Sequence, residues 1–218
     1  MSQPTILAPL TPSELITTIL ARHSHPTTVF ICWPRADFLN ALSADIETQK
    51  QEQQLSEHPL LLPPSIHQLV VSQQICLIFV SSVVHLRAAL ATFAGFRSRL
   101  PTSPPQEAAP DAPDSLPPLC LVYGFINLHR GGYEWSARGL GISASLVVVA
   151  ASRNSLVAVL ADAPLETSPL SLRVPIISGC SRRSDGSWNS PTVPLRIILR
   201  RWFREDAVEA TSSNEASV

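Results

Sequence analysis

The chain has 218 residues, of which 45% are hydrophobic and 15% are charged, so it can fold as one domain with a sizeable core. These fractions exclude a globally disordered chain, and a formal net charge of −1 selects neither nucleic acid nor membrane as a partner. Lys50 is the only lysine among sixteen basic residues. Arginine favours planar partners such as carboxylate and phosphate, although a coding bias toward arginine would give the same excess.

The four cysteines are not spaced as metal ligands, because none of them forms a C-x-x-C pair. Three of them, Cys32, Cys76 and Cys120, lie in apolar runs, so we expect buried, reduced thiols in an intracellular protein. The N-terminus has neither a basic start nor a long apolar stretch, and no secretory signal is expected. No apolar run reaches the roughly 18 residues needed to cross a bilayer, so we expect no membrane association.

The first hundred residues alternate between helix and strand patterns. A helix is predicted to begin at Thr11, because Thr11 can cap it, Pro12 suits its first turn and Glu14 can complete a capping box. Ser81 or Ser82 can cap a later helix in the same way. Apolar spacing predicts the other elements, which are strands at 28–33 and 75–80 and helices at 36–48, from 63 onward and from 82 to about 96.

Seven prolines lie within residues 101–118, so we expect a flexible loop there, inside the domain. A strand–helix–strand unit follows. Its strand patterns, Leu119–Tyr123 and Leu156–Leu160, are separated by a polar turn at His129–Gly132 and by a long helix rich in small residues. This order predicts a parallel pair of strands.

The pattern changes toward the end of the chain. Arg173–Ile177 and Val193–Phe203 are typical of two strands joined by a polar turn, which predicts antiparallel edge strands. Residues 205–218 are acidic and serine-rich, and we expect them to be disordered. The whole pattern predicts a single α/β domain over residues 1–204, with three layers and a mostly parallel sheet.

In an open parallel sheet, ligands bind beyond the carboxyl ends of the strands, so the residues that follow each strand indicate the chemistry. The segment Pro34–Asp37 has no glycine and no lysine and does not match a phosphate-binding loop. The segment Gly124–Asn127 has no carboxylate to hold Mg²⁺. Gly139 and Gly141 do not directly follow a strand, and the G-x-G-x-x-G fingerprint of dinucleotide-binding folds is absent. We therefore predict no nucleotide hydrolysis and no cofactor.

Other candidate catalytic groups have simpler interpretations. His129, Arg130 and Glu134 could form an acid–base group, but a polar cluster at a turn or helix end explains them as well. His23 and His25 form an H-x-H pair, which would bind a metal only with ligands from elsewhere. No Gly-x-Ser-x-Gly nucleophile elbow is present. The sequence therefore predicts no catalytic residue and no metal site.

The last predicted strand is the most informative part of the sequence. Side chains alternate along a strand, so one face would carry arginines with an aromatic ring set among them. The members of this strip are Arg196, Arg200, Trp202 and Arg204, and the preceding polar segment adds Arg182 and Arg183. A basic strip with a stacking ring suits a nucleic-acid backbone. A protein interface anchored by arginine and tryptophan, or a plain solvated face, would have the same composition.

Together these elements resemble a RecA-like core that has lost its nucleotide site. The strand at Thr28–Trp33 stands where a phosphate loop would follow, and the strand at Leu119–Tyr123 stands where a Mg²⁺-binding aspartate would end it. The closing segment, VPIISGC…SPTVPLRIILRRWF, is similar to the late strands of such cores. The arrangement is similar to small fungal proteins of this kind, including non-catalytic recombinase paralogues of the Shu type and the RecA-like subunits of Elongator.

This resemblance implies a non-catalytic subunit of a multiprotein complex that assists DNA recombination or repair in the nucleus, where the arginine strip would contact DNA. A scaffold subunit of a tRNA-modifying, Elongator-like assembly is the alternative, with the cytoplasm as the alternative location. A third hypothesis is a small enzyme or accessory protein of a metabolic pathway. Its pocket would lie at the carboxyl edge of the sheet, near Trp33, Asn127 and His129.

Overall fold

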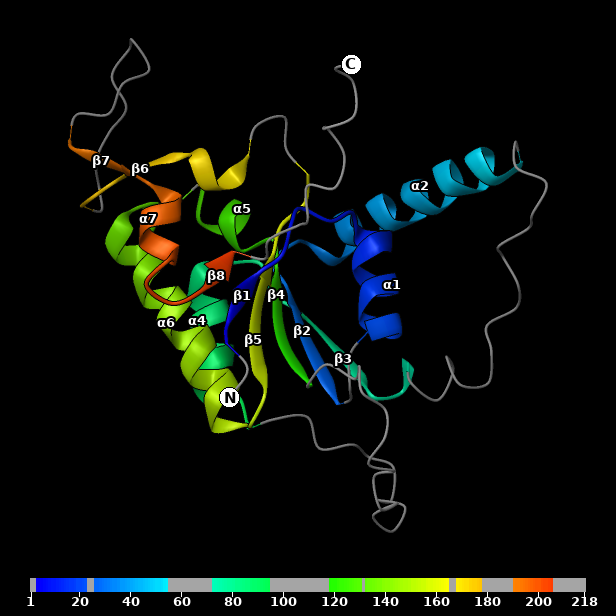
Figure 1. Ribbon diagram of the computed structural model, residues 1–218, viewed down its shortest axis with the longest axis horizontal. Coiled ribbons are helices and arrows are strands. Elements are labelled where there is room, and N and C mark those ends of the chain that lie inside the picture. Colours follow the sequence, from blue (N-terminus) through cyan, green and yellow to red (C-terminus); the bar gives the residue numbers. More distant parts are fainter. Residues whose placement is uncertain are drawn as a thin grey trace, which may run out of the picture.

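A parallel six-stranded sheet forms the centre of the molecule, and helices cover both of its faces (Figure 1). The computed structural model describes residues 3–22, 26–54, 72–94, 118–130, 132–164, 168–177 and 190–205. The strands of this sheet are β1 (Thr5–Ile6), β2 (Thr27–Ile31), β3 (Ile75–Phe79), β4 (Leu119–Tyr123), β5 (Val157–Ala161) and β8 (Arg204–Glu205). Their order across the sheet is β3-β2-β4-β5-β1-β8.

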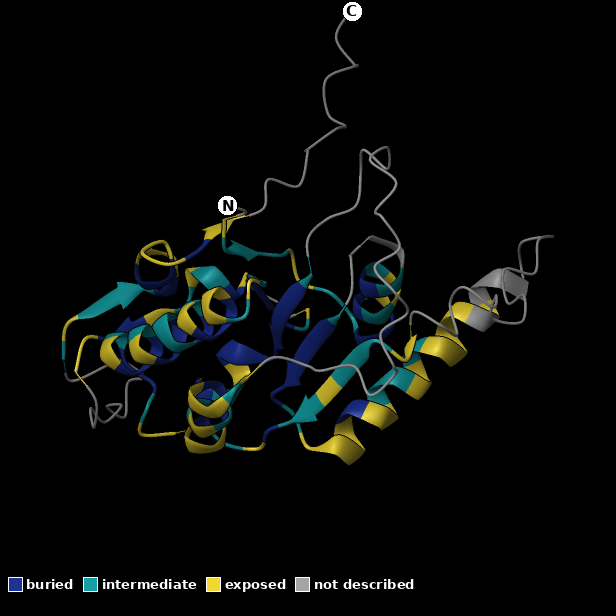
Figure 2. Ribbon diagram, turned by 90° about the horizontal axis from the view of Figure 1, so that it is seen from below, coloured by how far each residue is buried: buried dark blue, intermediate teal, exposed yellow. Residues whose placement is uncertain are grey.

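Two layers of helices enclose the sheet, which makes three layers in all. One face packs against α1 (Pro12–Arg22) and α2 (Arg35–Gln54). The other packs against α4 (Val83–Thr92), α5 (Phe125–Arg130), α6 (Ala137–Arg153) and α7 (Leu195–Leu199). Figure 2 shows the central strands fully buried and the outer sides of the helices exposed. The α/β class with a mostly parallel sheet is therefore confirmed.

The two sides of the sheet have separate cores because strand side chains alternate between faces. In β4, Cys120 and Val122 belong to the core under α4 and α6, whereas Leu121 and Tyr123 belong to the core under α1 and α2. A parallel strand that is covered on both faces has no polar side, which explains the continuous apolar run of β4. Cys32, Cys76 and Cys120 are free thiols; Cys32 and Cys120 are buried as expected, whereas Cys76 is only partly buried.

Two predicted helix caps are also confirmed. The N–H of Thr11 donates to Glu14 Oε2 at 2.8 Å, and the N–H of Glu14 donates to Thr11 Oγ1 at 3.4 Å, which is a capping box. Ser82 caps α4, since its side chain accepts a hydrogen bond from the N–H of His85. These caps fix where α1 and α4 begin.

An antiparallel C-terminal pair of strands is present, but it forms a separate small sheet. It consists of β6 (Arg173–Pro175) and β7 (Thr192–Pro194), and β6 follows a short 3-10 helix at Pro169–Ser171. At the edge of the main sheet, β8 pairs in parallel with β1.

The prediction of one long strand over Val193–Phe203 is wrong. The chain leaves β7 at Pro194, forms α7 and then turns through residues 200–202 into β8. The buried residues of this segment are Leu195, Ile198 and Leu199, and this i, i+3, i+4 spacing is that of a helix. The alternation of faces that was expected for a strand therefore does not apply to its arginines.

The predicted polar turn at His129–Gly132 begins too early, because Phe125–Arg130 forms the helix α5 and His129 is buried in it. Glu205, expected at the start of a disordered tail, lies in β8. Several predictions fall outside the described residues: the helix from residue 63, the proline-rich loop apart from Pro118, and the tail from residue 206 onward.

Candidate functional site

The turn between α7 and β8 holds most of the predicted arginine strip. Its backbone is fixed at both ends, because the N–H of Trp202 donates to Leu199 O at 2.9 Å and the N–H of Arg204 donates to Pro4 O at 2.9 Å. Phe203 is buried in the core beneath α6 and α7. A buried anchor between exposed neighbours holds the side chains of Arg201, Trp202 and Arg204 at the surface.

These side chains surround an open hollow of about 290 Å³, which we call the arginine hollow. Its lining residues are Gln3, Pro4, Arg200, Arg201, Trp202, Phe203 and Arg204. No acidic side chain is among them, and neither salt bridge within the described residues involves these arginines. Three guanidinium groups and a 38%-exposed indole therefore face one space, and no described carboxylate neutralises these guanidinium groups.

The structure changes the membership of the predicted strip. Arg200, Trp202 and Arg204 come together, as the sequence predicted, although a helix and a turn bring them together rather than a strand. Arg201 joins them, whereas strand alternation assigned it to the opposite face. Arg196 does not line the hollow and instead pairs with Glu205, with its Nε 2.7 Å from the carboxylate. Arg182 and Arg183 lie outside the described residues.

The carboxyl edge of the sheet, where α/β proteins usually bind ligands, is filled at its centre. The chain leaves β2 toward α2 and leaves β4 toward α5 on the opposite face, so the two strand ends diverge there. Trp33 occupies this point. Its indole lies against Gly124, whose φ is +81°, and a Cβ at Gly124 would be 2.7 Å from Trp33 Nε1. Trp33 Nε1 is buried and has no hydrogen-bond partner among the described residues.

A carboxylate that the sequence did not reveal lies at the same edge, directly after β5. Asp162 is only 8% exposed, and its Oδ1 accepts a hydrogen bond from the N–H of Ile126 at 3.1 Å, so it caps α5. Burial raises the pKa of Asp162 to about 7, although the backbone N–H groups of Ile126 and Asn127 favour the ionised form. The cap joins residues 36 positions apart, and no local sequence signal marks such a pair.

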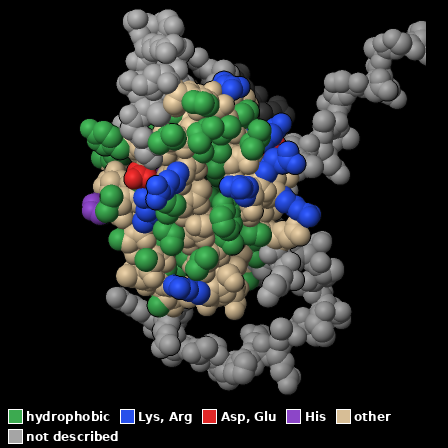
Figure 3. All heavy atoms as spheres, turned by 90° about the vertical axis from the view of Figure 1, so that its left-hand side faces the viewer, with side chains coloured by type: hydrophobic (Ala, Val, Ile, Leu, Met, Phe, Trp, Pro, Cys, Tyr) green, Lys and Arg blue, Asp and Glu red, His purple; other side chains and the backbone are tan. Residues whose placement is uncertain are grey.

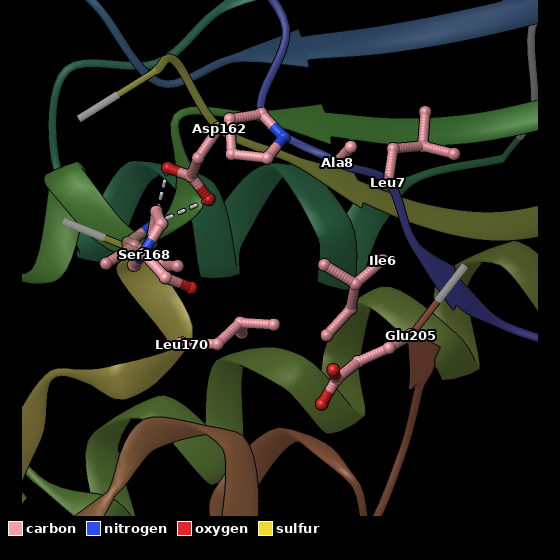
Figure 4. A pocket seen from close by; sticks show the side chains of 10 residues that line it. Ile6, Leu7, Ala8, Asp162, Ser168, Leu170 and Glu205 are labelled. Atoms are coloured by element: carbon pink, nitrogen blue, oxygen red, sulfur yellow. Dashed lines mark hydrogen bonds between the residues drawn. The ribbon is translucent and has the colours of Figure 1, made fainter. Parts of the chain in front are cut away.

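Asp162 lies at one end of a small pocket, and Glu205 lies at the other with Ile6 and Leu170 between them (Figure 4). The volume of the pocket is about 100 Å³, below the roughly 300 Å³ at which ligand pockets usually begin. Asp162 already accepts backbone hydrogen bonds there. We therefore assign this carboxylate to the support of α5.

His129 belongs to a buried polar network and not to an acid–base site. Its Nδ1 lies 2.8 Å from the carbonyl oxygen of Phe125, which can only accept, so Nδ1 carries the proton. Its Nε2 then accepts from Ser143 Oγ at 2.9 Å, and Ser143 Oγ accepts from Arg87 Nε at 2.9 Å. Burial lowers the pKa of His129 to about 4 and keeps the ring neutral.

The network connects α4, α5 and α6, and it is closed to a substrate because His129 and Ser143 are both fully buried. Glu134 joins it through Arg87, with 2.6 Å between the guanidinium and the carboxylate, whereas Arg130 is exposed. The sequence grouped His129 with Arg130 and Glu134 but gave no sign of Arg87. Neither the arginine hollow nor the small pocket is lined by the three residues of the metabolic-pocket hypothesis, Trp33, Asn127 and His129.

In the part of the chain that the structure describes, no three His, Cys, Asp or Glu side chains are grouped so that they could hold a metal ion. None of the described helices is long and apolar enough to cross a lipid bilayer. The sequence matches no known protein family, and neither a curated protein nor a solved structure matches the chain.

Proposed function

We propose that the protein is a non-catalytic α/β subunit that binds nucleic acid through the arginine hollow and assists DNA recombination or repair. The observation that carries this proposal is the convergence of Arg200, Arg201, Trp202 and Arg204 on one open space, whose lining contains no acidic side chain among the residues that the structure describes. The candidate catalytic side chains at the carboxyl edge of the sheet already have structural roles, which also supports the proposal. Trp33 packs against Gly124, Asp162 caps α5, and His129 connects α5 to α6.

The side chains of the hollow suit a single strand. Guanidinium groups pair with phosphate oxygens through two parallel hydrogen bonds, and an exposed indole offers a surface on which a base can stack. A hollow of about 290 Å³ is open enough for a phosphate and an unstacked base. Such contacts read the backbone and not the sequence, so we expect binding with little sequence preference.

The test is the binding of fluorescent oligothymidine by the purified chain, followed by anisotropy at several salt concentrations. We expect R200A/R204A to lower the affinity at least about tenfold. The slope of log affinity against log salt should fall by about 1.4, because each lost phosphate contact on a single strand accounts for about 0.7. W202A should weaken binding without changing the salt slope, because a stacking contact releases no counterion.

Arg35→Ala is the matched control, since Arg35 is an exposed arginine at the start of α2, on the other side of the sheet. Equal affinity and salt dependence for R200A/R204A and the wild type would refute the site. Competition with unlabelled tRNA then separates two roles. Efficient displacement of oligothymidine by tRNA would favour a tRNA-modifying assembly over DNA repair.

A further inference from the structure

The outward face of α6 carries two exposed aliphatic side chains, with Ser145 between them and an arginine at each end. We call this surface the α6 stripe, and its members are Arg138, Ile142, Val149 and Arg153. At 100° per residue these four positions lie within about 60° of one another around the helix. Arg138 and Arg153 are 15 residues apart, so the stripe is about 22 Å long.

The core does not account for these side chains. The buried face of α6 consists of other residues, including Leu140, Val147 and Ala151. Ile142 is 40% exposed and Val149 is 42% exposed, although both belong to a helix that otherwise packs its apolar residues inward. Ile197 of α7, the helix that packs beside α6, is also exposed, at 55%.

The two charged residues of the α6 stripe are both positive. Neither described salt bridge involves Arg138 or Arg153. The two acidic side chains of neighbouring elements are already neutralised, because Glu134 pairs with Arg87 and Glu205 with Arg196. Figure 3, which faces the side of the molecule with α6 and α7, shows blue arginines spaced among green apolar side chains and few red ones.

We propose that the α6 stripe is a docking surface for an amphipathic helix of a partner protein, with acidic residues at both ends of its apolar face. Aliphatic side chains three or four residues apart on that helix would cover Ile142 and Val149, as in other helix-to-helix contacts. Carboxylates at its two ends would meet Arg138 and Arg153. The proposal is independent of nucleic-acid binding, since no member of the stripe lines the arginine hollow.

Charge complementarity selects this occupant over a second copy of the chain. A symmetric dimer through the stripe would bring the same surface against itself, and the arginines of both copies would then lie together without counter-charges. A nucleic-acid backbone would satisfy the arginines but would leave Ile142 and Val149 without an apolar partner. An acidic amphipathic helix satisfies both kinds of side chain.

The first experiment uses a synthetic helical peptide of about 20 residues, with leucines three and four residues apart and two glutamates at each end. A second peptide has lysine in place of every glutamate. We expect the acidic peptide to bind the full chain at least about tenfold more tightly than the lysine peptide. Two double variants, I142S/V149S and R138E/R153E, should each lower that affinity at least about tenfold.

The matched control is L39S/I46S on α2, because Leu39 and Ile46 are 43% and 37% exposed and lie on the opposite side of the sheet. This control should bind the acidic peptide as the wild type does. Equal binding of both peptides would overturn the proposal, as would an effect of L39S/I46S equal to that of I142S/V149S. Oligothymidine binding by I142S/V149S, which leaves the charge of the chain unchanged, shows separately whether the proposed function holds.

A second measurement tests the surface in cells, with a photo-cross-linking residue at Ser145, between Ile142 and Val149, and another at Ser43 of α2 as the control. The proposal expects one cross-linked segment at Ser145 with apolar residues three or four apart and acidic ends, lost in I142S/V149S. Cross-links to a second copy of the chain, to lipid or to nucleic acid would overturn it. Equal yields at Ser145 and Ser43 would overturn it as well.

Discussion

The carboxyl edge of the sheet and the turn between α7 and β8 differ in how they use polar side chains. At the carboxyl edge of the sheet, Asp162 caps α5, His129 is enclosed by Ser143 and Phe125, and Trp33 fills the space between the ends of β2 and β4. In the turn after α7, three arginines face an open hollow and form no salt bridge with another described residue. The polar groups of the edge therefore have structural partners, whereas we propose that those of the turn bind nucleic acid. Variants of the two regions should affect different measurements.

The largest expected effect is the pH dependence caused by Asp162. Its pKa is about 7 in the folded chain and near 4 in an unfolded one, so the folded state binds an extra proton between these values. The stability from this group is complete below about pH 4 and is lost as the pH rises through 7. Asp162→Asn removes the ionisation. Relative to the wild type, its unfolding free energy should rise by about 4 kcal/mol between pH 4 and pH 8.

Urea denaturation of both proteins at several pH values measures this difference directly. Oligothymidine affinity should stay the same in D162N, because Asp162 does not line the arginine hollow. A stability difference that is constant from pH 4 to pH 8 would mean that the pKa of Asp162 in the folded chain is close to its value in the unfolded chain. The edge of the sheet would then be better solvated than its burial indicates.

A smaller effect is expected at the contact between Trp33 and Gly124. A Cβ at Gly124 would be 2.7 Å from Trp33 Nε1, and the φ of +81° is unfavourable for any residue with a side chain. Gly124→Ala should therefore lower the unfolding free energy by about 3 kcal/mol. Gly141→Ala is the matched control, because nothing lies within 4 Å of its Cβ position in α6. It should raise stability by up to about 1 kcal/mol.

Both glycine variants should bind oligothymidine with wild-type affinity at a temperature where they remain folded. A loss of affinity in G124A without a loss of stability would place the edge of the sheet, and not the turn, at the binding site. That result would contradict the assignment of structural roles to the edge and of nucleic-acid binding to the turn.

Most of the parallel sheet was predictable because β2, β3, β4 and β5 are apolar runs bounded by turn or cap residues. β1 and β8 have two residues each, too few for any periodicity to appear. The helix α7 was mistaken for a strand because Ile197-Ile198-Leu199 is an uninterrupted apolar run. Its helical spacing becomes visible only when the buried residues Leu195, Ile198 and Leu199 are known.

The sequence predicted which residue types belong to the site but not how the fold brings them together. The arginines and Trp202 are close in sequence, so any compact local structure places them near one another. The contacts at the edge depend on strand order instead. Asp162 reaches Ile126 because β5 lies beside β4, and Trp33 meets Gly124 because β2 lies on the other side of β4. Patterns along a single sequence do not contain that order.

The smallest expected effect concerns Arg196, which pairs with Glu205 and, unlike the other arginines of this segment, does not line the arginine hollow. The pair is partly exposed, so breaking it should change stability by less than about 1 kcal/mol. Its loss would leave the Glu205 carboxylate next to Arg204 without a counter-charge. We therefore expect Arg196→Ala to lower oligothymidine affinity about threefold, through Glu205, and R196A/E205Q to restore it. If R196A lowers affinity as much as R200A and E205Q restores nothing, Arg196 contacts the phosphates itself, and the binding surface extends from the turn onto α7.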